Sequence, residues 1–329
     1  MNRKAKIIGT GAYLPERVLT NGDLERMVET TDEWIVSRTG MKERRIARAD
    51  EFTSDMGSSA SRIAIADAKL TPDQIDFIIV ATITPDYTFP STACLIQHEI
   101  GAKGAGAMDI QAACTGYLYA LFVAKSLVES GSYRNILVVA PDKLSSITNY
   151  KDRSTCILFG DGAAAAVISL EGKGLSIETV RLGADGEQGA LLIMPGGGCR
   201  QPASAESVAN DQHYIKMAGN EVFKHAVRRM ESASRECLEA AKVNEKEIAW
   251  VIPHQANIRI IDAMAKRFEH LPPERVFKTV HKYGNTSASS VGIALDELLK
   301  SNTVKSGEKI LLTAFGAGFT WGAAVLQYE

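Results

Sequence analysis

The stretch AKLTPDQIDFIIVAT at residues 68–82 returns later in the chain as AKVNEKEIAWVIPHQ at residues 241–255. Each copy leads from a helix-like segment through a polar turn into a run of apolar and β-branched residues, which is typical of a buried strand. The start of the copies at Ala68 and Ala241 defines the offset between them. An internal repeat of this kind predicts that the chain is built from two related halves.

Two further pairs of segments support the duplication. RNILVVA and EKILLTA align with Ile136 on Ile310, at almost the same offset, and GAAAAVIS is similar to WGAAVLQY with Gly162 on Gly322, at a shorter offset. Chance reuse of strand patterns in α/β proteins is the alternative. Because two of the three offsets are nearly equal, we favour duplication, with one half at 1–172 and the other at 173–329.

Strand-like runs alternate with helix-like segments along both halves, which predicts an α/β fold with both sheet faces covered. We expect strands at 76–84, 134–141, 163–170, 248–254 and 308–315. We expect helices at 53–69, 114–130, 218–242, 257–268 and 287–300, where apolar residues recur at helical spacing. Residues 183–215 are rich in glycine, proline, serine and alanine, so we expect an irregular excursion that acts as a lid or a substrate wall.

The composition argues against several classes of protein. The 329 residues carry a net charge of -2, which does not favour binding to nucleic acid or to an anionic membrane. No run of about 18 uncharged apolar residues occurs and the N-terminus does not resemble a signal peptide, so we expect a cytoplasmic protein without a membrane span. Its 5 cysteines include no C-x-x-C pair, which argues against a disulfide framework and against a metal site.

Cys114 stands in AACTGYLYAL, directly before a helix-like run. The N-terminus of a helix favours negative charge, so this position is expected to lower the pKa of the thiol and to make it a nucleophile. The alternative is simple packing at a helix start, which is the more common role of a cysteine in the cytosol.

Three other residues favour chemistry at Cys114. His254 ends a predicted strand, where α/β proteins place site residues. Asn285 lies in GNTSASS, at an offset from Cys114 close to that of the repeat, so a twofold axis between the halves would bring the two residues face to face. Gly316 follows a predicted strand in FGAGF, where backbone N–H groups can form an oxyanion hole for acyl transfer. Each also has a structural explanation, as a hydrogen-bonded core histidine or as part of a tight turn.

The order Cys, His, Asn is shared with papain-like hydrolases. Such an enzyme would carry C-G-[SA]-C-[WY] near its mature N-terminus, whereas the nucleophile here lies in AACTGY beyond residue 100. The glycine turn at 316 is not a dinucleotide-binding fingerprint, because the motif is incomplete. The residues themselves therefore favour thiol-based acyl transfer.

Four groups of segments together resemble the β-ketoacyl-[acyl-carrier-protein] synthase III family: AACTGYLYAL, FGDGAAAAV, PHQANIRI with GNTSASS, and FGAGFTWGAAVL. TTDEWIVSRTGMKERRI near the N-terminus adds to the likeness, which covers essentially the whole chain. The combination is highly specific, although chalcone synthases share Cys-His-Asn. The resemblance implies the thiolase fold, in which two duplicated α/β halves form a five-layered α-β-α-β-α core, as well as a homodimer and no cofactor.

The resemblance implies a role for each central residue. Cys114 would attack the thioester of an acyl-CoA primer, expected to be acetyl-CoA, and hold the acyl group, with the N–H groups of Cys114 and Gly316 as the oxyanion hole. Malonyl-[acyl-carrier protein] would then lose carbon dioxide while His254 and Asn285 donate hydrogen bonds to its thioester carbonyl. An amide suits this task because it donates without carrying charge.

The resemblance also implies contacts outside the catalytic centre, although an ordinary solvated helix face is the alternative for most of them. Phe89 would reach across the dimer to wall the acyl pocket of the other chain. The residues expected to contact CoA are Trp34 and Arg153 at the adenine, Arg38 at a phosphate, and Thr30, Asn220, Phe223 and Asn257 along the tunnel. The residues expected to dock the acidic carrier protein are Lys224, Arg259, Lys266 and Arg267.

Two residues depart from the family pattern. Thr115 follows the nucleophile, where a smaller residue is expected, and Tyr283 precedes Gly284, where histidine is common. His281 invites a Cys-His-His arrangement, but we expect it to play a supporting role. The departures leave open which primer is used. The alternatives are a related condensing enzyme of a secondary pathway and a non-condensing thioesterase, although a thioesterase would not need both His254 and Asn285.

Overall fold

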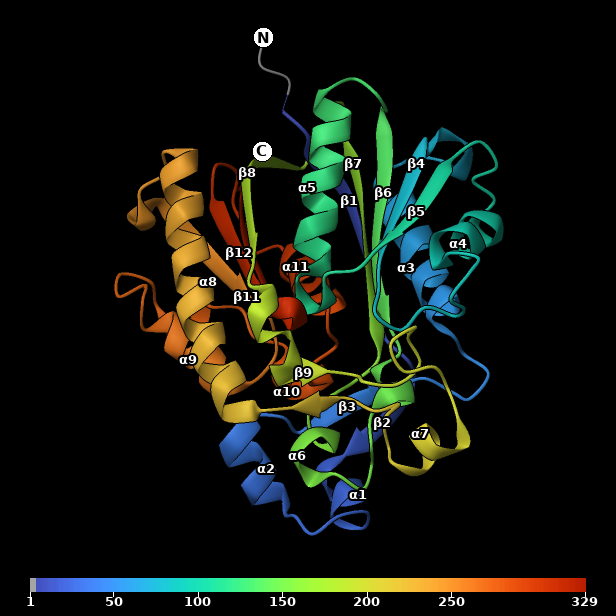
Figure 1. The fold of residues 1–329 in the computed structure, drawn as a ribbon. Helices are drawn as coiled ribbons and strands as arrows, with labels where there is room; N and C mark the ends of the chain where they lie inside the picture. Colours follow the sequence, from blue (N-terminus) through green and yellow to red (C-terminus); the bar gives the residue numbers. More distant parts are fainter. Residues whose placement is uncertain (1–3) are drawn as a thin grey trace.

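The computed structural model describes residues 4–329 and is built around a nine-stranded sheet (Figure 1). Its strands lie in the order β11-β12-β13-β8-β1-β7-β6-β4-β5. They are β1 (Lys6–Tyr13), β4 (Phe77–Ala81), β5 (Gly106–Ile110), β6 (Asn135–Asp142), β7 (Gly162–Ser169), β8 (Leu175–Ala184), β11 (Ile248–Pro253), β12 (Lys309–Gly316) and β13 (Thr320–Tyr328). Two smaller sheets pair β2 (Arg17–Thr20) with β3 (Glu43–Ile46) and β9 (Leu192–Ile193) with β10 (Lys216–Met217).

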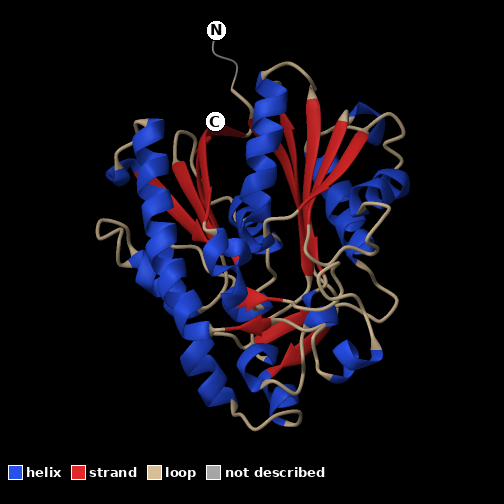
Figure 2. Ribbon diagram, in the orientation of Figure 1, coloured by secondary structure: helices blue, strands red, loops and turns tan. Residues whose placement is uncertain are grey.

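The longer helices form three layers around the two ends of this sheet (Figures 1 and 2). α3 (Thr53–Asp67) and α4 (Thr92–Ile100) cover one outer face, and α8 (Gly219–Ala241) and α9 (Ile258–Ala265) cover the other. α5 (Gly116–Glu129) and α11 (Ser289–Lys300) lie between the two ends of the sheet, which gives the predicted five layers. The short helices are α1 (Asn21–Glu25), α2 (Asp32–Thr39), α6 (Arg153–Cys156), α7 (Ala205–Ala209) and α10 (Val280–Tyr283).

The pattern of strand pairing repeats on the two sides of the junction between β8 and β1. β4 pairs in parallel with β6, which pairs antiparallel with β7, and β7 pairs antiparallel with β1. β11, β12, β13 and β8 follow the same series of pairings. The sequence offsets match this order, because they place β4 on β11, β6 on β12 and β7 on β13. The boundary predicted at 172/173 falls in the link between β7 and β8 and stays a prediction.

The repeat extends to the turns that open the two central helices. Ala113 before α5 and Ser287 before α11 are related by the same offset as β6 and β12, and both have a left-handed backbone, with φ of 45° and 54°. Few residues other than glycine adopt this conformation, so its recurrence at equivalent positions supports the duplication. The two turns touch, since a Cβ at Gly116 would lie 3.3 Å from the Cβ of Ala288. The segments that carry the predicted nucleophile and the predicted amide donor therefore meet in the central layer.

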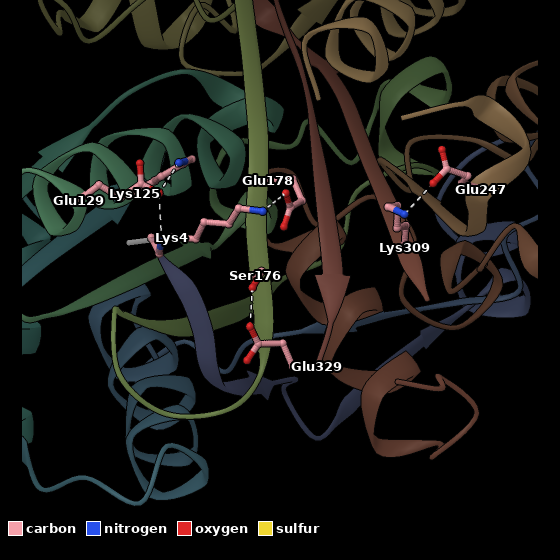
Figure 3. A network of polar contacts seen from close by, with 9 residues as sticks. Lys4, Lys125, Glu129, Ser176, Glu178, Glu247, Lys309 and Glu329 are labelled. Atoms are coloured by element: carbon pink, nitrogen blue, oxygen red, sulfur yellow. Dashed lines mark hydrogen bonds and ion pairs between the residues drawn. The ribbon is translucent and has the colours of Figure 1, made fainter. Parts of the chain in front are cut away.

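The junction between the two ends of the sheet is short. Its residue pairs are Lys6 with Ser176 and Ile7 with Leu175. Figure 3 shows polar contacts around it, including Lys4 Nζ at 2.5 Å from Glu178 Oε2 and Ser176 Oγ at 2.8 Å from Glu329 Oε1. The ion pair between Lys4 and Glu178 lies at the surface, where such a pair contributes about 1 kcal/mol or less.

Apolar packing in the central layer connects the two halves more strongly. One buried cluster combines α5, α11 and strands from both ends of the sheet, and it includes the fully buried Leu118, Leu121, Val291 and Leu295. Burying such a side chain contributes about 1.5–3 kcal/mol. A separate cluster lies under α3 and α4, and another lies under α8 and α9.

The predicted strands and helices are all present, with two corrections. α9 ends at Ala265 instead of 268, because the chain turns there and Phe268 enters the apolar cluster that α8 covers. Residues 183–215 are more ordered than predicted, since they contain β9, α7 and a 3-10 segment at Gly186–Leu191. Within residues 4–329, no helix is both long and apolar enough to cross a membrane, and no three His, Cys, Asp or Glu side chains gather as metal ligands.

Candidate active site

Cys114, His254, Asn285 and Gly316 line one cavity of about 720 Å³. Cys114 follows β5, His254 follows β11 and Gly316 ends β12. Each of these strands has a parallel neighbour, and the carboxyl ends of parallel strands are where α/β proteins form their sites. Asn285 reaches the cavity from the turn before α11. The structure thus brings together the residues that the sequence pointed to.

Cys114 lies in a tight turn at the start of α5. The turn is a single 3-10 segment, Ala113–Thr115, which the chain enters through the left-handed Ala113. Glycine is required at 116, because a Cβ there would lie 2.9 Å from the Cβ of Ala81 in β4. Close packing of α5 against β4 therefore fixes the position from which Cys114 enters the cavity.

The thiol of Cys114 is a weak acid in this structure. The residue is partly exposed to the cavity, and burial of the site is the main influence that raises the pKa of the thiol to about 12. The Ser287 hydroxyl lowers this pKa, and the Asp142 carboxylate raises it. The expected lowering of this pKa by the helix start is not borne out, because desolvation is the largest influence and raises the pKa.

Asp142 and Ser287 are two buried polar groups that the sequence did not single out. One carboxylate oxygen of Asp142 accepts hydrogen bonds from Thr82 Oγ1, Ile83 N and Thr84 Oγ1, at 2.8, 2.9 and 3.0 Å. Its other oxygen and the Ser287 hydroxyl make no hydrogen bond of standard geometry among the described residues. The Ser287 hydroxyl nevertheless lies close enough to Cys114 and Asp142 to lower the pKa of both groups. Burial raises the pKa of Asp142, and its hydrogen bonds oppose this. No sequence motif marks either residue, since each acts through contacts made by the fold.

His254 is buried, and burial lowers its pKa to about 3, so the ring is neutral near pH 7. Nδ1 lies 2.6 Å from Ser290 Oγ, which also accepts a hydrogen bond from Gln255 N at 3.3 Å. Within residues 4–329 the Ser290 hydroxyl has no other acceptor, so its proton points at Nδ1 and the ring proton sits on Nε2. His254 therefore offers an N–H donor from Nε2.

Asn285 is held by the backbone of the segment that contains FGDG. Asn285 N donates to Leu158 O at 2.9 Å, and Gly160 N donates to Asn285 O at 3.0 Å. The side-chain Oδ1 accepts from Ser287 N at 2.9 Å, which leaves Nδ2 to act as a donor in the cavity. Gly284 is needed before it, because φ is 65° and a Cβ would lie 2.8 Å from Leu158 O.

Gly316 packs directly on the turn that carries Cys114. A Cβ at Gly316 would lie 2.7 Å from Cys114 N and 3.2 Å from Thr115 N. Its φ of -150° is ordinary extended backbone, so glycine is needed here for space and not for conformation. Two backbone segments at this close approach can direct N–H groups at one oxygen, as an oxyanion hole requires.

The outer part of the cavity contains most of the residues predicted to contact CoA. Those that line it are Trp34, Arg38, Asn220, Phe223 and Asn257. Arg153 and Thr30 are not among the lining residues. Arg153 Cζ lies 5.0 Å from the ring centre of Trp34, so the two side chains contact each other at the rim. Thr30 Oγ1 is buried and has no partner in the described part of the chain.

The basic residues predicted to dock a carrier protein have different surroundings, and their docking role stays a prediction. Arg259 lines the cavity, and its guanidinium lies 5.5 Å from the ring centre of Phe223. Lys224 is exposed and paired with a neighbouring glutamate at 2.7 Å. Lys266 and Arg267 line a different groove together with four glutamates.

The remaining predicted residues lie at the edge of the site or outside it. Leu192, Ile193 and Met194 line the cavity, as expected for a substrate wall in the 183–215 segment. Phe89 is 84% exposed in the single chain and lies outside the cavity. His281 and Tyr283 do not line the cavity either, and the Tyr283 hydroxyl donates to Glu297 of α11.

Comparison with known protein families gives two matches. Residues 108–186 match the model described as 3-oxoacyl-[acyl-carrier-protein (ACP)] synthase III, and residues 238–328 match the model of its C-terminal part. The chain is also 58% identical over 325 residues to β-ketoacyl-[acyl-carrier-protein] synthase III of Chlamydia muridarum (strain MoPn / Nigg), covering 98% of this chain and 99% of the relative.

Solved structures are similar over the full length. A crystal structure of 3-oxoacyl-[acyl-carrier-protein] synthase III from Aquifex aeolicus VF5 has a TM-score of 0.90 and 49% identity, covering 98% of this chain and 100% of the other. The priming β-ketosynthase of the R1128 polyketide biosynthetic pathway has a TM-score of 0.90 and 36% identity, with coverage of 100% and 97%.

Proposed function

This chain belongs to the β-ketoacyl-[acyl-carrier-protein] synthase III family and is a condensing acyltransferase that initiates fatty-acid synthesis. We propose that it joins a short acyl-CoA to malonyl-[acyl-carrier protein] through an acyl group held on Cys114. The observation that carries the proposal is the convergence of one thiol and two uncharged donors, His254 and Asn285, on a single cavity. The two substrates and one proton from solvent supply every atom that the reaction needs, so it requires no cofactor.

In the first step Cys114 takes the acyl group from CoA. A bond forms between Sγ and the acyl carbon, the bond to the CoA sulfur breaks, and the thiol proton leaves on CoA as its own thiol. The N–H groups of Cys114 and Gly316 stabilise the oxyanion that forms on the carbonyl oxygen. The raised pKa of the thiol means that Cys114 is protonated near pH 7 in the unoccupied site.

In the second step malonyl-[acyl-carrier protein] loses carbon dioxide. The electron pair of the broken C–C bond becomes an enolate, and its oxygen accepts hydrogen bonds from His254 Nε2 and Asn285 Nδ2. The enolate carbon then attacks the acyl carbon on Cys114, and the C–S bond breaks to give a 3-ketoacyl-[acyl-carrier protein]. Cys114 leaves as a thiolate, which takes a proton from solvent and becomes a thiol again. The neutral state of His254 supports this role, because a ring with one proton on Nε2 donates without becoming an acid.

We propose acetyl-CoA as the primer. Ile83, Leu144 and Phe159 line the cavity and pack in one apolar cluster, which offers an uncharged wall for a short acyl group. The second candidate is another acyl-CoA used in a secondary pathway. The similarity to a priming ketosynthase of polyketide synthesis favours this second candidate. The structure from Aquifex aeolicus has the same TM-score and a higher sequence identity, so we place acetyl-CoA first.

The surroundings of the site suggest three further features. We propose a homodimer, in which the exposed Phe89 of one chain walls the acyl pocket of the other. We propose that the carrier protein docks near Arg259 and Lys224, because Arg259 lies at the cavity and Lys266 and Arg267 lie among glutamates elsewhere. A cytoplasmic location would suit an enzyme whose nucleophile must remain a reduced thiol.

The proposal is tested with purified protein, malonyl-[acyl-carrier protein] and a panel of acyl-CoA primers from acetyl to branched, long and aromatic. We expect the acetyl primer to give an acyl-enzyme by intact-mass measurement and a 3-ketoacyl product, and we expect the Cys114→Ala variant to give neither. Acyl-enzyme at normal levels in Cys114→Ala would remove the assignment of the nucleophile. Release of free acid without a ketoacyl product in the native protein would favour the thioesterase.

A further inference from the structure

Thr115, the residue that departs from the family pattern beside the nucleophile, takes part in a buried hydroxyl pair. Its side chain is fully buried, and Oγ1 lies 2.6 Å from Ala112 O and 2.7 Å from Thr320 Oγ1. Thr320 Oγ1 in turn lies 3.0 Å from Ala112 O and 3.0 Å from Ala317 O. Four short contacts therefore surround two hydroxyl groups.

The protons of these hydroxyls can be assigned by counting. Each threonine has one proton to donate, and a separation of 2.7 Å between two hydroxyl oxygens is the usual length of an O–H···O hydrogen bond. One proton therefore lies between the two threonines, and the other goes to a backbone carbonyl. The two hydroxyls therefore donate one hydrogen bond between themselves and one to a single carbonyl, Ala112 O or Ala317 O.

The hydrogen bonds of these two hydroxyls join two turns that are far apart in the sequence. Residues 112–115 form the turn that carries Cys114, and residues 316–320 form the glycine turn between β12 and β13. Thr115 and Thr320 are 205 positions apart, and in the described part of the protein the hydrogen bonds between the two turns both involve Thr320. The two turns supply the N–H groups of Cys114 and Gly316.

We propose that Thr115 and Thr320 are positioning residues for acyl transfer: their hydroxyl pair, here called the threonine clasp, holds the two N–H donors of the oxyanion hole at a fixed separation. This inference rests on the proposed function, because it assigns the oxyanion hole to Cys114 and Gly316. Such donors must lie within about 2.7–3.1 Å of the oxyanion, and a misplacement of about 1 Å costs on the order of 100-fold in rate.

The Thr115→Val variant removes the hydroxyl and nearly preserves the shape of the side chain. Ala112 O keeps two donors in that variant, Thr115 N at 3.1 Å and Thr320 Oγ1 at 3.0 Å, so no buried carbonyl is left without a partner. Thr115→Ser restores the hydroxyl. Ser61→Ala is a matched control, because it removes a buried hydroxyl from α3, away from the cavity.

The assay separates positioning of the oxyanion hole from reactivity of the thiol. Acylation from saturating acetyl-CoA is followed by intact-mass measurement, and alkylation of Cys114 by iodoacetamide, which forms no oxyanion, is followed in parallel. We expect Thr115→Val and Thr320→Val each to acylate about 10- to 100-fold more slowly. We expect KM for the primer and the alkylation rate to change less than about threefold, and the double variant to be little slower than the slower single one.

We expect Thr115→Ser and Ser61→Ala to acylate within about threefold of the native protein. The slower acylation of the valine variants would then come from loss of the clasp and not from loss of any buried hydroxyl. The proposal is overturned if Thr115→Val acylates at the native rate, if its alkylation slows in proportion to its acylation, or if Thr115→Ser fails to restore the rate. These outcomes concern only the clasp, because the proposed function fails separately if the native protein does not form acyl-Cys114.

Discussion

Replacing Gly316 by alanine tests whether close contact between the two turns sets the rate of acylation. The added Cβ would lie 2.7 Å from Cys114 N, whereas ordinary contact begins at 3.4 Å, so the turns must separate by about 0.7 Å. The extended φ of -150° accommodates alanine without strain, so the effect is one of distance alone. A shift of this size exceeds the tolerance of about 0.5 Å that catalytic groups need.

We expect Gly316→Ala to lower the rate of Cys114 acylation about 100-fold, which corresponds to about 2.7 kcal/mol in the barrier. Overpacking of this kind also lowers the free energy of unfolding by about 1–3 kcal/mol. Acylation from acetyl-CoA is measured by quenched intact-mass time courses, and stability is measured by denaturant unfolding. Gly104→Ala is the matched control, because a Cβ at Gly104 has no atom within 4 Å.

Two results would contradict this reasoning. The first is acylation of Gly316→Ala within about threefold of the native rate, which would mean that the separation of the turns does not limit the chemistry. The second is an equal loss of rate in Gly104→Ala, which would mean that the chain is sensitive to any added methyl group.

Three further predictions concern the groups around the cavity. Asn285→Ala should still acylate Cys114 but should condense about 100-fold more slowly, because one donor to the enolate is lost; equal losses in both steps, measured by intact mass and by product formation, would contradict this. Since the Cys114 pKa is raised to about 12, the thiolate fraction should grow about tenfold per pH unit from pH 6 to 9, and a plateau in iodoacetamide alkylation below pH 9 would refute it. Ser290→Ala should slow condensation about tenfold and leave acylation unchanged, because the Ser290 hydroxyl directs the His254 proton to Nε2; unchanged condensation kinetics would remove this role.

The sequence predicts those features that depend on local pattern and on the repeat. The runs at 76–84 and 248–254 identify equivalent strands because buried parallel strands are continuously apolar. Cys114 and Asn285 were expected in one place because the offset between the halves relates the turns that carry them. His254 was expected near them because it ends a predicted strand.

Features that depend on contacts between distant segments were missed or mispredicted. The pKa of Cys114 is set by burial of the site and by Ser287 and Asp142, whose approach follows from the packing of both halves. Ser290 lies 36 positions from His254, and no spacing rule connects them.

The short junction between β1 and β8 makes substrate binding part of what holds the two halves together. The strands share only two residue pairs there, while the cavity is walled by Cys114 from one half and by His254 and Gly316 from the other. By thermodynamic linkage, a ligand that touches both walls stabilises their docked arrangement, by about 2.7 kcal/mol at one hundred times its dissociation constant. The occupied enzyme is thus the more tightly joined one, and amide protons along the seam should exchange more slowly when acyl-CoA is bound.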